Sequence, residues 1–231
     1  MGDGRGTAET GRSLTEAHQP GSHVPGSHQP GEVAVVESVV RRRRMTRVFS
    51  TDPLDPAVVA DLVDIARHAP SAGYSQGVHF IVLTGDAVAS FWQTTDAEAW
   101  FAKTQDGVLL APVIILPIAD SGAYTSRYSE ADKAGHGLDI AANWPVPFWL
   151  TDTAMAIQNL LLLVEARYLG ALYFGIFRNV DMLLADLGVP EGLLSVGAIA
   201  VGYRAASDRP SGSATSRPRR SITEVVHHNQ W

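Results

Sequence analysis

TDTAMAIQNLLLLVEARYLG, residues 151–170, is the stretch that indicates most about the fold. Its spacing predicts the longest helix of the chain, over Asp152–Leu169, with Gly170 as the residue that ends it. The run is apolar nearly all round, and a helix of that kind must be surrounded by protein. We therefore expect other elements of the fold to cover this helix.

Short apolar runs on both sides of this helix predict the strands of a sheet. Ala111–Ala119 (APVIILPIA) is nearly continuous, so we expect burial on both faces, although Pro112 and Pro117 shorten its hydrogen-bonded part. The other expected strands are His79–Thr84, Ala171–Phe177 and Val196–Tyr203.

Helix signals fall between these strands without regular alternation. A helix with an Arg-rich last turn is expected over Val33–Arg44, and Asp55-Pro56 is a strong N-cap pair for a second helix that stops before Pro70. Shorter helices are expected from Asp86 through Phe91 and from Asn179 to Leu187, the latter ended by Gly188. This irregular order predicts an α+β fold.

Composition narrows the class of protein. A chain of 231 residues with 45% hydrophobic content can bury one sizeable core, which favours a single domain. No apolar run approaches the roughly 18 residues of a membrane span, and no signal segment opens the chain, so we expect a cytoplasmic protein. The absence of cysteine excludes disulfides, thiolate metal sites and thiol nucleophiles. A net charge of −6 argues against general nucleic-acid binding.

The first 32 residues differ from the rest. They are rich in Gly, Ser, His and Pro and contain a five-residue quasi-repeat that begins at His18, His23 and His28. Such a stretch has too little apolar surface to offset the entropy of ordering it. We expect a disordered tail over 1–32 and a folded domain over 33–231. The three histidines could chelate a metal, but flexible His-Pro repeats are more often solvated, and no metal site is expected.

Two arginine clusters lie near the ends of the folded segment: Arg43-Arg44-Met45-Thr46-Arg47-Val48-Phe49 and Arg217-Pro218-Arg219-Arg220. The planar guanidinium suits phosphate, and two such clusters can converge on one dianion after folding. Taken alone, the first run could also be a solvated helix end or a nucleic-acid contact. Ser71 lacks the Gly-x-Ser-x-Gly elbow of a nucleophile and is better interpreted as a hydroxyl donor.

The order of three motifs resembles the FMN-dependent nitroreductase family. The motifs are Arg-Arg-x-x-Arg-x-Phe at 43–49, Ala-Pro-Ser-x-x-x-Ser-Gln at 69–76, and a basic tail before Val-Val-His, and the match runs from about Val33 to Trp231. The resemblance implies a central mixed or antiparallel sheet flanked by helices. It also implies an intertwined homodimer with the long helix at the interface.

The resemblance further implies a set of FMN contacts. The first motif would reach the phosphate, the ribityl chain and the N1–C2 carbonyl edge of the ring, the second would lie near the ring and ribityl, and a third would present backbone groups to flavin N5. Two tail cations would close on the phosphate, usually from the partner subunit. The residues are Arg43, Arg44, Met45 and Arg47; Pro70, Ser71, Ala72 and Tyr74; Phe174, Gly175 and Ile176; and Arg217 and Arg219.

Two positions depart from the family pattern. Met45 stands where Ser is common, so it can contribute its backbone amide but no hydroxyl. Tyr74 stands where Asn is common, and its ring could narrow the pocket or stack on the flavin.

The activity implied by the resemblance is hydride transfer from NADH or NADPH to flavin N5 and then, in ping-pong order, to a nitroaromatic, a quinone or another metabolite. Arg47 is the expected cation near N1–C2=O, and no side-chain acid or base is required. A flavin oxidase or dehydrogenase that passes electrons to oxygen is one alternative, and a non-catalytic flavin-binding protein is another. The segment Ser121–Phe148 has few periodic signals and is a candidate lid or substrate wall.

Overall fold

Five antiparallel strands form the sheet of the computed structural model, which describes residues 1–2 and 30–231. Every residue of β2 is buried, as its apolar run predicted. The α+β fold with a central antiparallel sheet is therefore confirmed. The strand order is β1 (Val78–Thr84), β2 (Val113–Ala119), β5 (Ala198–Gly202) and β3 (Gly170–Phe174), with the two-residue β4 (Leu194–Ser195) paired to the end of β2.

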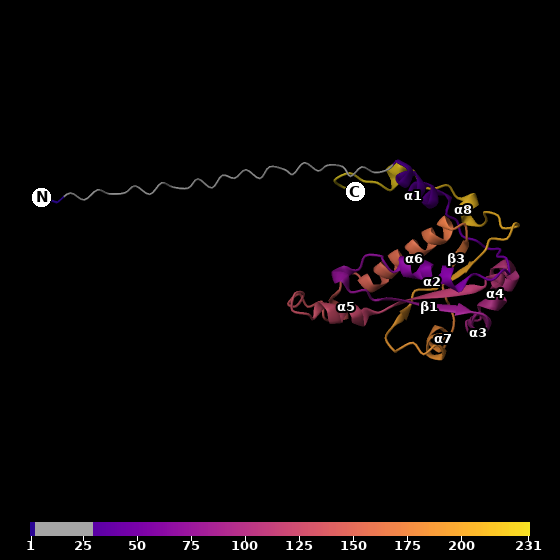
Figure 1. Cartoon of the computed structure of the whole chain (residues 1–231), viewed down its shortest axis with the longest axis horizontal. Helices are drawn as coiled ribbons and strands as arrows, with labels where there is room; N and C mark the ends of the chain where they lie inside the picture. Colours follow the sequence, from indigo (N-terminus) through magenta and orange to yellow (C-terminus); the bar gives the residue numbers. More distant parts are fainter. Residues whose placement is uncertain (3–29) are drawn as a thin grey trace.

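Helices cover both faces of the sheet (Figure 1). Alternate side chains of a strand point to opposite faces, so Ile115 and Ile199 pack on one side, whereas Ile114 and Ala200 pack on the other. The first face is covered by α2 (Pro56–Ala66) and α6 (Phe148–Ala166). The second is covered by α3 (Asp86–Thr94), α4 (Ala97–Thr104), the 3₁₀ turn η2 (Asp106–Leu110) and α7 (Val180–Asp186).

The long helix α6 begins and ends earlier than predicted. It starts at Phe148 rather than Asp152 and stops at Ala166, and Tyr168 follows in the left-handed region at φ 59°. Gly170 does not end the helix but begins β3, where an added Cβ would come within 2.7 Å of the Thr46 hydroxyl oxygen. Glycine is required there by this close approach.

The expected enclosure of α6 is only partial within one chain. Its buried face includes polar Asp152, Thr153 and Glu165, while Met155 remains 39% exposed. The other residues that the structure describes leave this part of the helix open.

Other boundaries shift by a few residues. Helix α1 (Pro30–Arg42) begins before Val33, and the strands β3 and β5 are shorter than expected. Helix α3 begins at Asp86 as expected, with Gly85 as its N-cap residue, and Asn179 is the N-cap residue of α7, although its side chain donates to Thr94 O and forms no capping hydrogen bond. The tail expected over 1–32, with its three repeat histidines, lies almost wholly outside the described residues, so that boundary stays a prediction.

The segment expected to be a lid is partly helical. It contains α5 (Ser121–Tyr128), whose N-terminus is capped by the Asp120 carboxylate, and the turn η3 (Ala141–Asn143). Trp144 and Trp149 are buried with Tyr124 in a small aromatic cluster. The segment is thus anchored to the core by its aromatic side chains.

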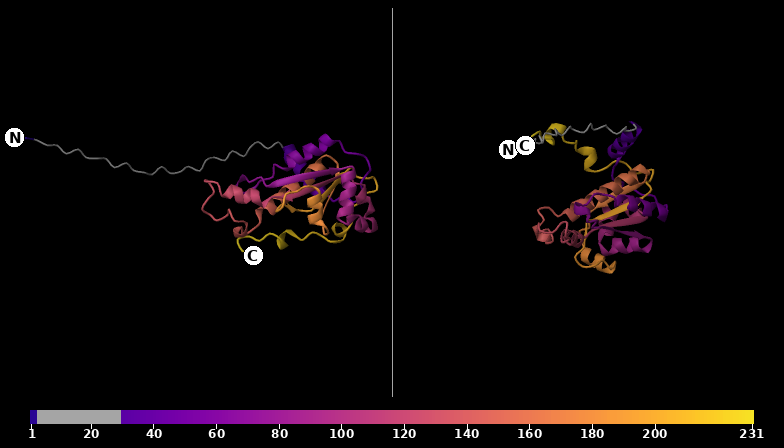
Figure 2. Two further views of the ribbon diagram at one scale, coloured as in Figure 1. Left: turned by 90° about the horizontal axis from the view of Figure 1, so that it is seen from below. Right: turned by 60° about the vertical axis from the view of Figure 1, so that its left-hand side comes forward.

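Helix α1 and the C-terminal tail both project from the α6 side of the molecule (Figures 1 and 2). The tail carries α8 (Ser213–Ser216) and η4 (Ile222–Glu224), and its side chains with described burial are exposed from Arg209 onward. In the two views of Figure 2 the tail runs outside the packed core. Among the described residues, no helix combines the length and apolar character needed to cross a bilayer.

Candidate cofactor site

The first arginine motif is fixed beside the end of the sheet where β3 begins. Thr46 N donates to Ala171 O at 2.8 Å, Phe49 N donates to Gly107 O at 3.0 Å, and Ser50 N donates to Tyr203 O at 2.9 Å. The Phe49 ring is fully buried. Main-chain hydrogen bonds therefore set the register of the motif, which leaves its arginine side chains available for other contacts.

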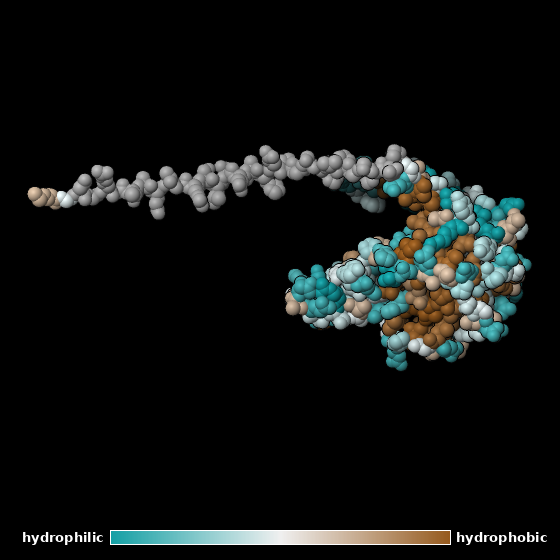
Figure 3. All heavy atoms as spheres, viewed as in Figure 1, coloured by the Kyte–Doolittle hydropathy of each residue, from teal (hydrophilic) through white to brown (hydrophobic). Residues whose placement is uncertain are grey.

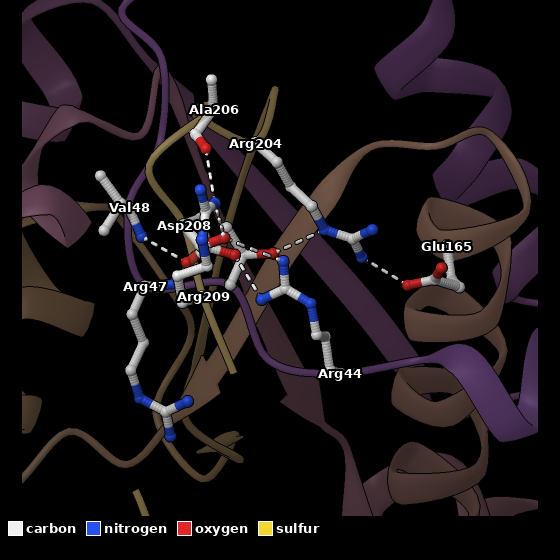
Figure 4. A network of polar contacts seen from close by, with 9 residues as sticks. Arg44, Arg47, Val48, Glu165, Arg204, Ala206, Asp208 and Arg209 are labelled. Carbon is white, nitrogen blue, oxygen red and sulfur yellow. Dashed lines mark hydrogen bonds and ion pairs between the residues drawn. The ribbon is translucent and has the colours of Figure 1, made fainter. Parts of the chain in front are cut away.

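Asp208 ties this motif to the start of the C-terminal tail (Figure 4). Its carboxylate forms an ion pair with Arg44 and accepts hydrogen bonds from the backbone N–H groups of Arg47 at 2.9 Å and Val48 at 3.0 Å. The residue is only 5% exposed. No sequence motif marks Asp208, because its partners lie about 160 residues away along the chain.

Glu165 on α6 balances two further arginines. It accepts from Arg42 Nε at 3.1 Å and pairs with Arg204, which also donates to Thr46 Oγ1 at 3.0 Å. Neither Glu165 nor Arg204 was expected from the sequence, because neither residue belongs to a motif.

Arg43 and Arg47 are the motif cations without an ionic partner in the described part of the chain. One terminal nitrogen of Arg43 is buried and has no hydrogen-bond partner there. The Arg47 guanidinium points away from Asp208 (Figure 4). The Met45 side chain is half-buried and packs against both core clusters. These two arginines are therefore the groups available to an anionic ligand.

The second motif forms a tight loop anchored by buried polar contacts. The Asp152 carboxylate accepts from Ala72 N at 2.9 Å and from the Tyr124 hydroxyl at 2.7 Å. Burial, and then the hydrogen bond and charge of Asp152, raise the pKa of the Tyr124 phenol above its ordinary value. Arg127 Nε donates to Gly73 O at 2.9 Å. Helices α5 and α6 thus hold this loop from two sides.

Tyr74 stands at the tip of that loop with its ring in solvent. It is 76% exposed and adopts φ 59°, next to Gly73 at φ 61°. A left-handed conformation costs a non-glycine residue roughly 1–2 kcal/mol, and such strain often gathers at functional sites. The Ser71 hydroxyl oxygen accepts from Gln76 N at 3.0 Å, which closes the loop on itself.

The third motif lies at the other end of β3, beside an aromatic pocket. The Phe174 ring stacks on Trp92 at 5.7 Å and meets Phe101 edge-on at 5.2 Å. The pocket has a volume of about 530 Å³, within the range of small-molecule sites. Its lining consists of α3–α4 residues and the stretch after β3: Phe91, Thr95, Asp96, Ala97, Ala99, Trp100, Phe101, Lys103, Phe174, Gly175, Ile176, Phe177 and Arg178.

Within one chain the predicted residues form separate groups. The first and third motifs flank β3, whose five residues span roughly 14 Å at about 3.4 Å per residue. No polar contact between described residues joins either motif to the Ser71–Tyr74 loop, or to Arg217 and Arg219, which are exposed on the projecting tail. No group of three His, Asp or Glu residues suited to a metal ion occurs in the described ranges.

Comparison with known proteins places the same part of the chain in one family. A family model described as "Nitroreductase family" matches residues 40–203. An Archaeoglobus fulgidus protein named "Putative NADH dehydrogenase/NAD(P)H nitroreductase" is 23% identical over 168 residues, which cover 71% of this chain and 83% of that protein. A Rhodospirillum rubrum protein named 5,6-dimethylbenzimidazole synthase is 27% identical over 183 residues, which cover 73% of this chain and 81% of that protein.

A solved structure shares the fold. It is described as a putative nitroreductase from Desulfovibrio desulfuricans in complex with FMN. The two chains are 25% identical and superpose with a TM-score of 0.58 over 85% of this chain and 97% of that one.

Proposed function

Since this chain belongs to the nitroreductase family, we propose that it is an FMN-dependent oxidoreductase that takes electrons from NADH or NADPH. The observation that carries the proposal is the arrangement along β3. Arg43 and Arg47 lie at one end and have no ionic partner among the described residues, and the aromatic pocket lies beside Phe174–Ile176 at the other. FMN has the matching layout, with a phosphate at one end of an extended molecule and a planar ring at the other.

The arginines of the first motif suit the phosphate group of FMN. A buried N–H group without an acceptor is costly, and a phosphate oxygen would satisfy the orphaned nitrogen of Arg43. Arg47 would add a second cation. Arg44 is already balanced by Asp208, so it would act mainly by fixing the position of the motif.

The pocket beside the third motif suits the flavin ring of FMN. FMN, when bound, accepts a hydride from the nicotinamide and later delivers it to an acceptor, so the two substrates use the site in turn. Phe174 would supply an apolar wall, and Gly175 and Ile176, which also line the pocket, would help to orient the ring. No side-chain acid or base is needed, and we assign none.

We place the complete site between two copies of the chain. In the described part of the chain, no polar contact joins the first motif to the Ser71–Tyr74 loop, Arg217 or Arg219, and a partner subunit would supply these groups. Apolar side chains exposed on α1 and on the tail would gain cover in such a dimer, and Figure 3 shows apolar surface beneath these projections. They are Val33, Val35, Val36 and Val40 on α1, and Ile222, Val225, Val226 and Trp231 on the tail.

The acceptor would be a small molecule such as a nitroaromatic, a quinone or another metabolite. The relatives above carry different activities in their names, so family membership does not choose among acceptors. The proposal includes a cytoplasmic location, as expected from the sequence.

The absorbance spectrum of the purified protein tests the cofactor and the reaction together. Twin flavin bands, FMN as the released cofactor, and bleaching by NADH or NADPH without oxygen are the expected results. Flavin that no nicotinamide bleaches would favour the oxidase or the non-catalytic alternative. FAD, or no flavin after reconstitution, would contradict the proposal.

The dimer is tested by shortening the tail at a position that the structure selects. A chain that ends at Ser211 keeps Asp208 and its contacts but loses Arg217 and Arg219. We expect it to lose both dimer stability and FMN. A shortened protein that remains a yellow dimer in light scattering would rule out this arrangement.

A further inference from the structure

The buried carboxylate of Asp152 on α6 forms no ion pair with any residue that the structure describes. Two other carboxylates are buried in the described part of the chain, those of Glu165 and Asp208, and each pairs with an arginine side chain. Removing a carboxylate from water is costly unless a partner balances its charge. Packing alone therefore does not explain an acid at this position of the helix.

The hydrogen bonds of Asp152 join α6 to the second motif and to α5. Its Oδ2 atom accepts from Ala72 N at 2.9 Å and from the Tyr124 hydroxyl at 2.7 Å, and its Oδ1 atom accepts from Thr151 Oγ1 at 3.2 Å. Burial raises the pKa of the Tyr124 phenol, so this hydroxyl stays protonated and remains a donor. One carboxylate oxygen thus holds a backbone group of the motif and a side chain of α5 together.

The loop that Asp152 holds has a backbone conformation that needs external support. Gly73 and Tyr74 lie in the left-handed region, at φ 61° and 59°. Such a conformation persists in a non-glycine residue only where surrounding contacts over-determine it. Within the loop, Tyr74 N donates to Ser71 O at 2.9 Å. Asp152 is the only acceptor of the Ala72 N–H group among the described residues, so it supplies the contact between this amide and the core.

We propose that Asp152 is a positioning residue of the cofactor site, which holds the Ala72 peptide so that the Ser71–Tyr74 loop is already ordered when the flavin binds. The inference rests on the proposed function and adds Asp152 to the same site, where it acts through the loop and not by contact with the cofactor. A loop that is ordered before binding loses less conformational entropy when the ligand arrives. The cost of burying the carboxylate is then offset by tighter flavin binding.

Three variants of nearly unchanged shape separate the acceptor from the charge. Asp152→Leu removes both, whereas Asp152→Asn removes the charge but keeps an oxygen that can accept from Ala72 N and the Tyr124 hydroxyl. Thr153→Val is the matched control, because Thr153 is equally buried but its hydroxyl donates to Trp149 O at 2.7 Å, within the helix. In a fluorescence titration of folded protein with FMN, we expect Asp152→Leu to weaken binding about tenfold, the size of about one hydrogen bond. Asp152→Asn and Thr153→Val should stay within about twofold of the unchanged protein.

Two further measurements report on the loop and on the ring. Hydrogen exchange of the peptide that contains Ala72, in flavin-free protein, should be faster in Asp152→Leu than in the unchanged protein or in Thr153→Val. The visible circular dichroism of the flavin-saturated protein, which depends on how the ring is held, should change in Asp152→Leu and return in Asp152→Asn. Asp152→Ala takes the place of the leucine variant if that variant does not fold.

The outcomes distinguish this inference from the proposed function. If FMN binds to Asp152→Leu with unchanged affinity and an unchanged dichroism spectrum, the inference is overturned and the proposed function stands. A loss of affinity in Asp152→Asn or Thr153→Val as large as that in Asp152→Leu overturns the inference in the same way. An unchanged protein that binds no FMN overturns both.

Discussion

Asp208 offers the sharpest test of how the first arginine motif is held. Its carboxylate is almost fully buried, pairs with Arg44 and accepts from two backbone N–H groups, those of Arg47 and Val48. Replacing it by Ala removes all three contacts at once. Replacing it by Asn keeps an oxygen that can accept from the backbone, but it turns an amide donor toward the Arg44 guanidinium.

The magnitude follows from these contacts. Removing one partner of a buried ion pair costs about 3–5 kcal/mol, and a hydrogen bond to a charged group contributes about 1.5–3 kcal/mol. The Arg44 side chain is 29% exposed, so water can partly rehydrate it, which favours the lower end. We expect the free energy of unfolding to fall by about 3 kcal/mol in Asp208→Ala and by about 2 kcal/mol in Asp208→Asn.

Urea denaturation of the flavin-free proteins, at one protein concentration, measures this loss. Asp64→Asn is the matched control, because Asp64 pairs with Arg67 at 2.6 Å but both side chains are more than half exposed. A surface pair of this kind contributes about 0–1 kcal/mol. If Asp208→Asn destabilises the protein no more than Asp64→Asn does, the buried contacts of Asp208 do not hold the first motif to the tail as we infer.

Three further predictions concern the loop, the phosphate and pH. Gly73→Ala should lower the free energy of unfolding by about 1–3 kcal/mol more than Gly85→Ala: both glycines have positive φ, but only at Gly73 would a Cβ approach a Tyr128 ring atom, at 2.7 Å. Equal urea midpoints for the two variants would contradict this. Arg43→Ala should weaken FMN binding by about 1.5–3 kcal/mol in a fluorescence titration, while Arg41→Ala, at an exposed position of α1, should leave it nearly unchanged. Equal affinities would remove Arg43 from the site. Because the pKa of Tyr124 is raised, the folded protein keeps a proton that the unfolded chain releases above about pH 10, so stability should fall as pH rises through that range. Tyr124→Phe should show a shallower fall in urea midpoint between about pH 9 and pH 11, and an identical slope would refute the assignment.

Much of the fold follows from local sequence pattern. The apolar run of β2, the cap pair before α2 and the apolar length of α6 each depend on residues within a few positions of one another, so periodicity reveals them. The motif residues were likewise visible as spacing, as in Arg43-Arg44 and Pro70-Ser71. The short helices α4 and α5 were missed, because their few turns carry little periodic signal.

Tertiary structure alone decided which charges meet. Asp208 reaches Arg44 across 164 residues, and Asp152 reaches the second motif across 80, although nothing near either aspartate in the sequence marks a partner. Local pattern fixes which segments become helices and strands, because their backbone and apolar side chains respond to near neighbours. Only the packing of those elements brings distant polar groups within hydrogen-bond reach, and thereby determines which arginines are already paired and which remain available for a ligand.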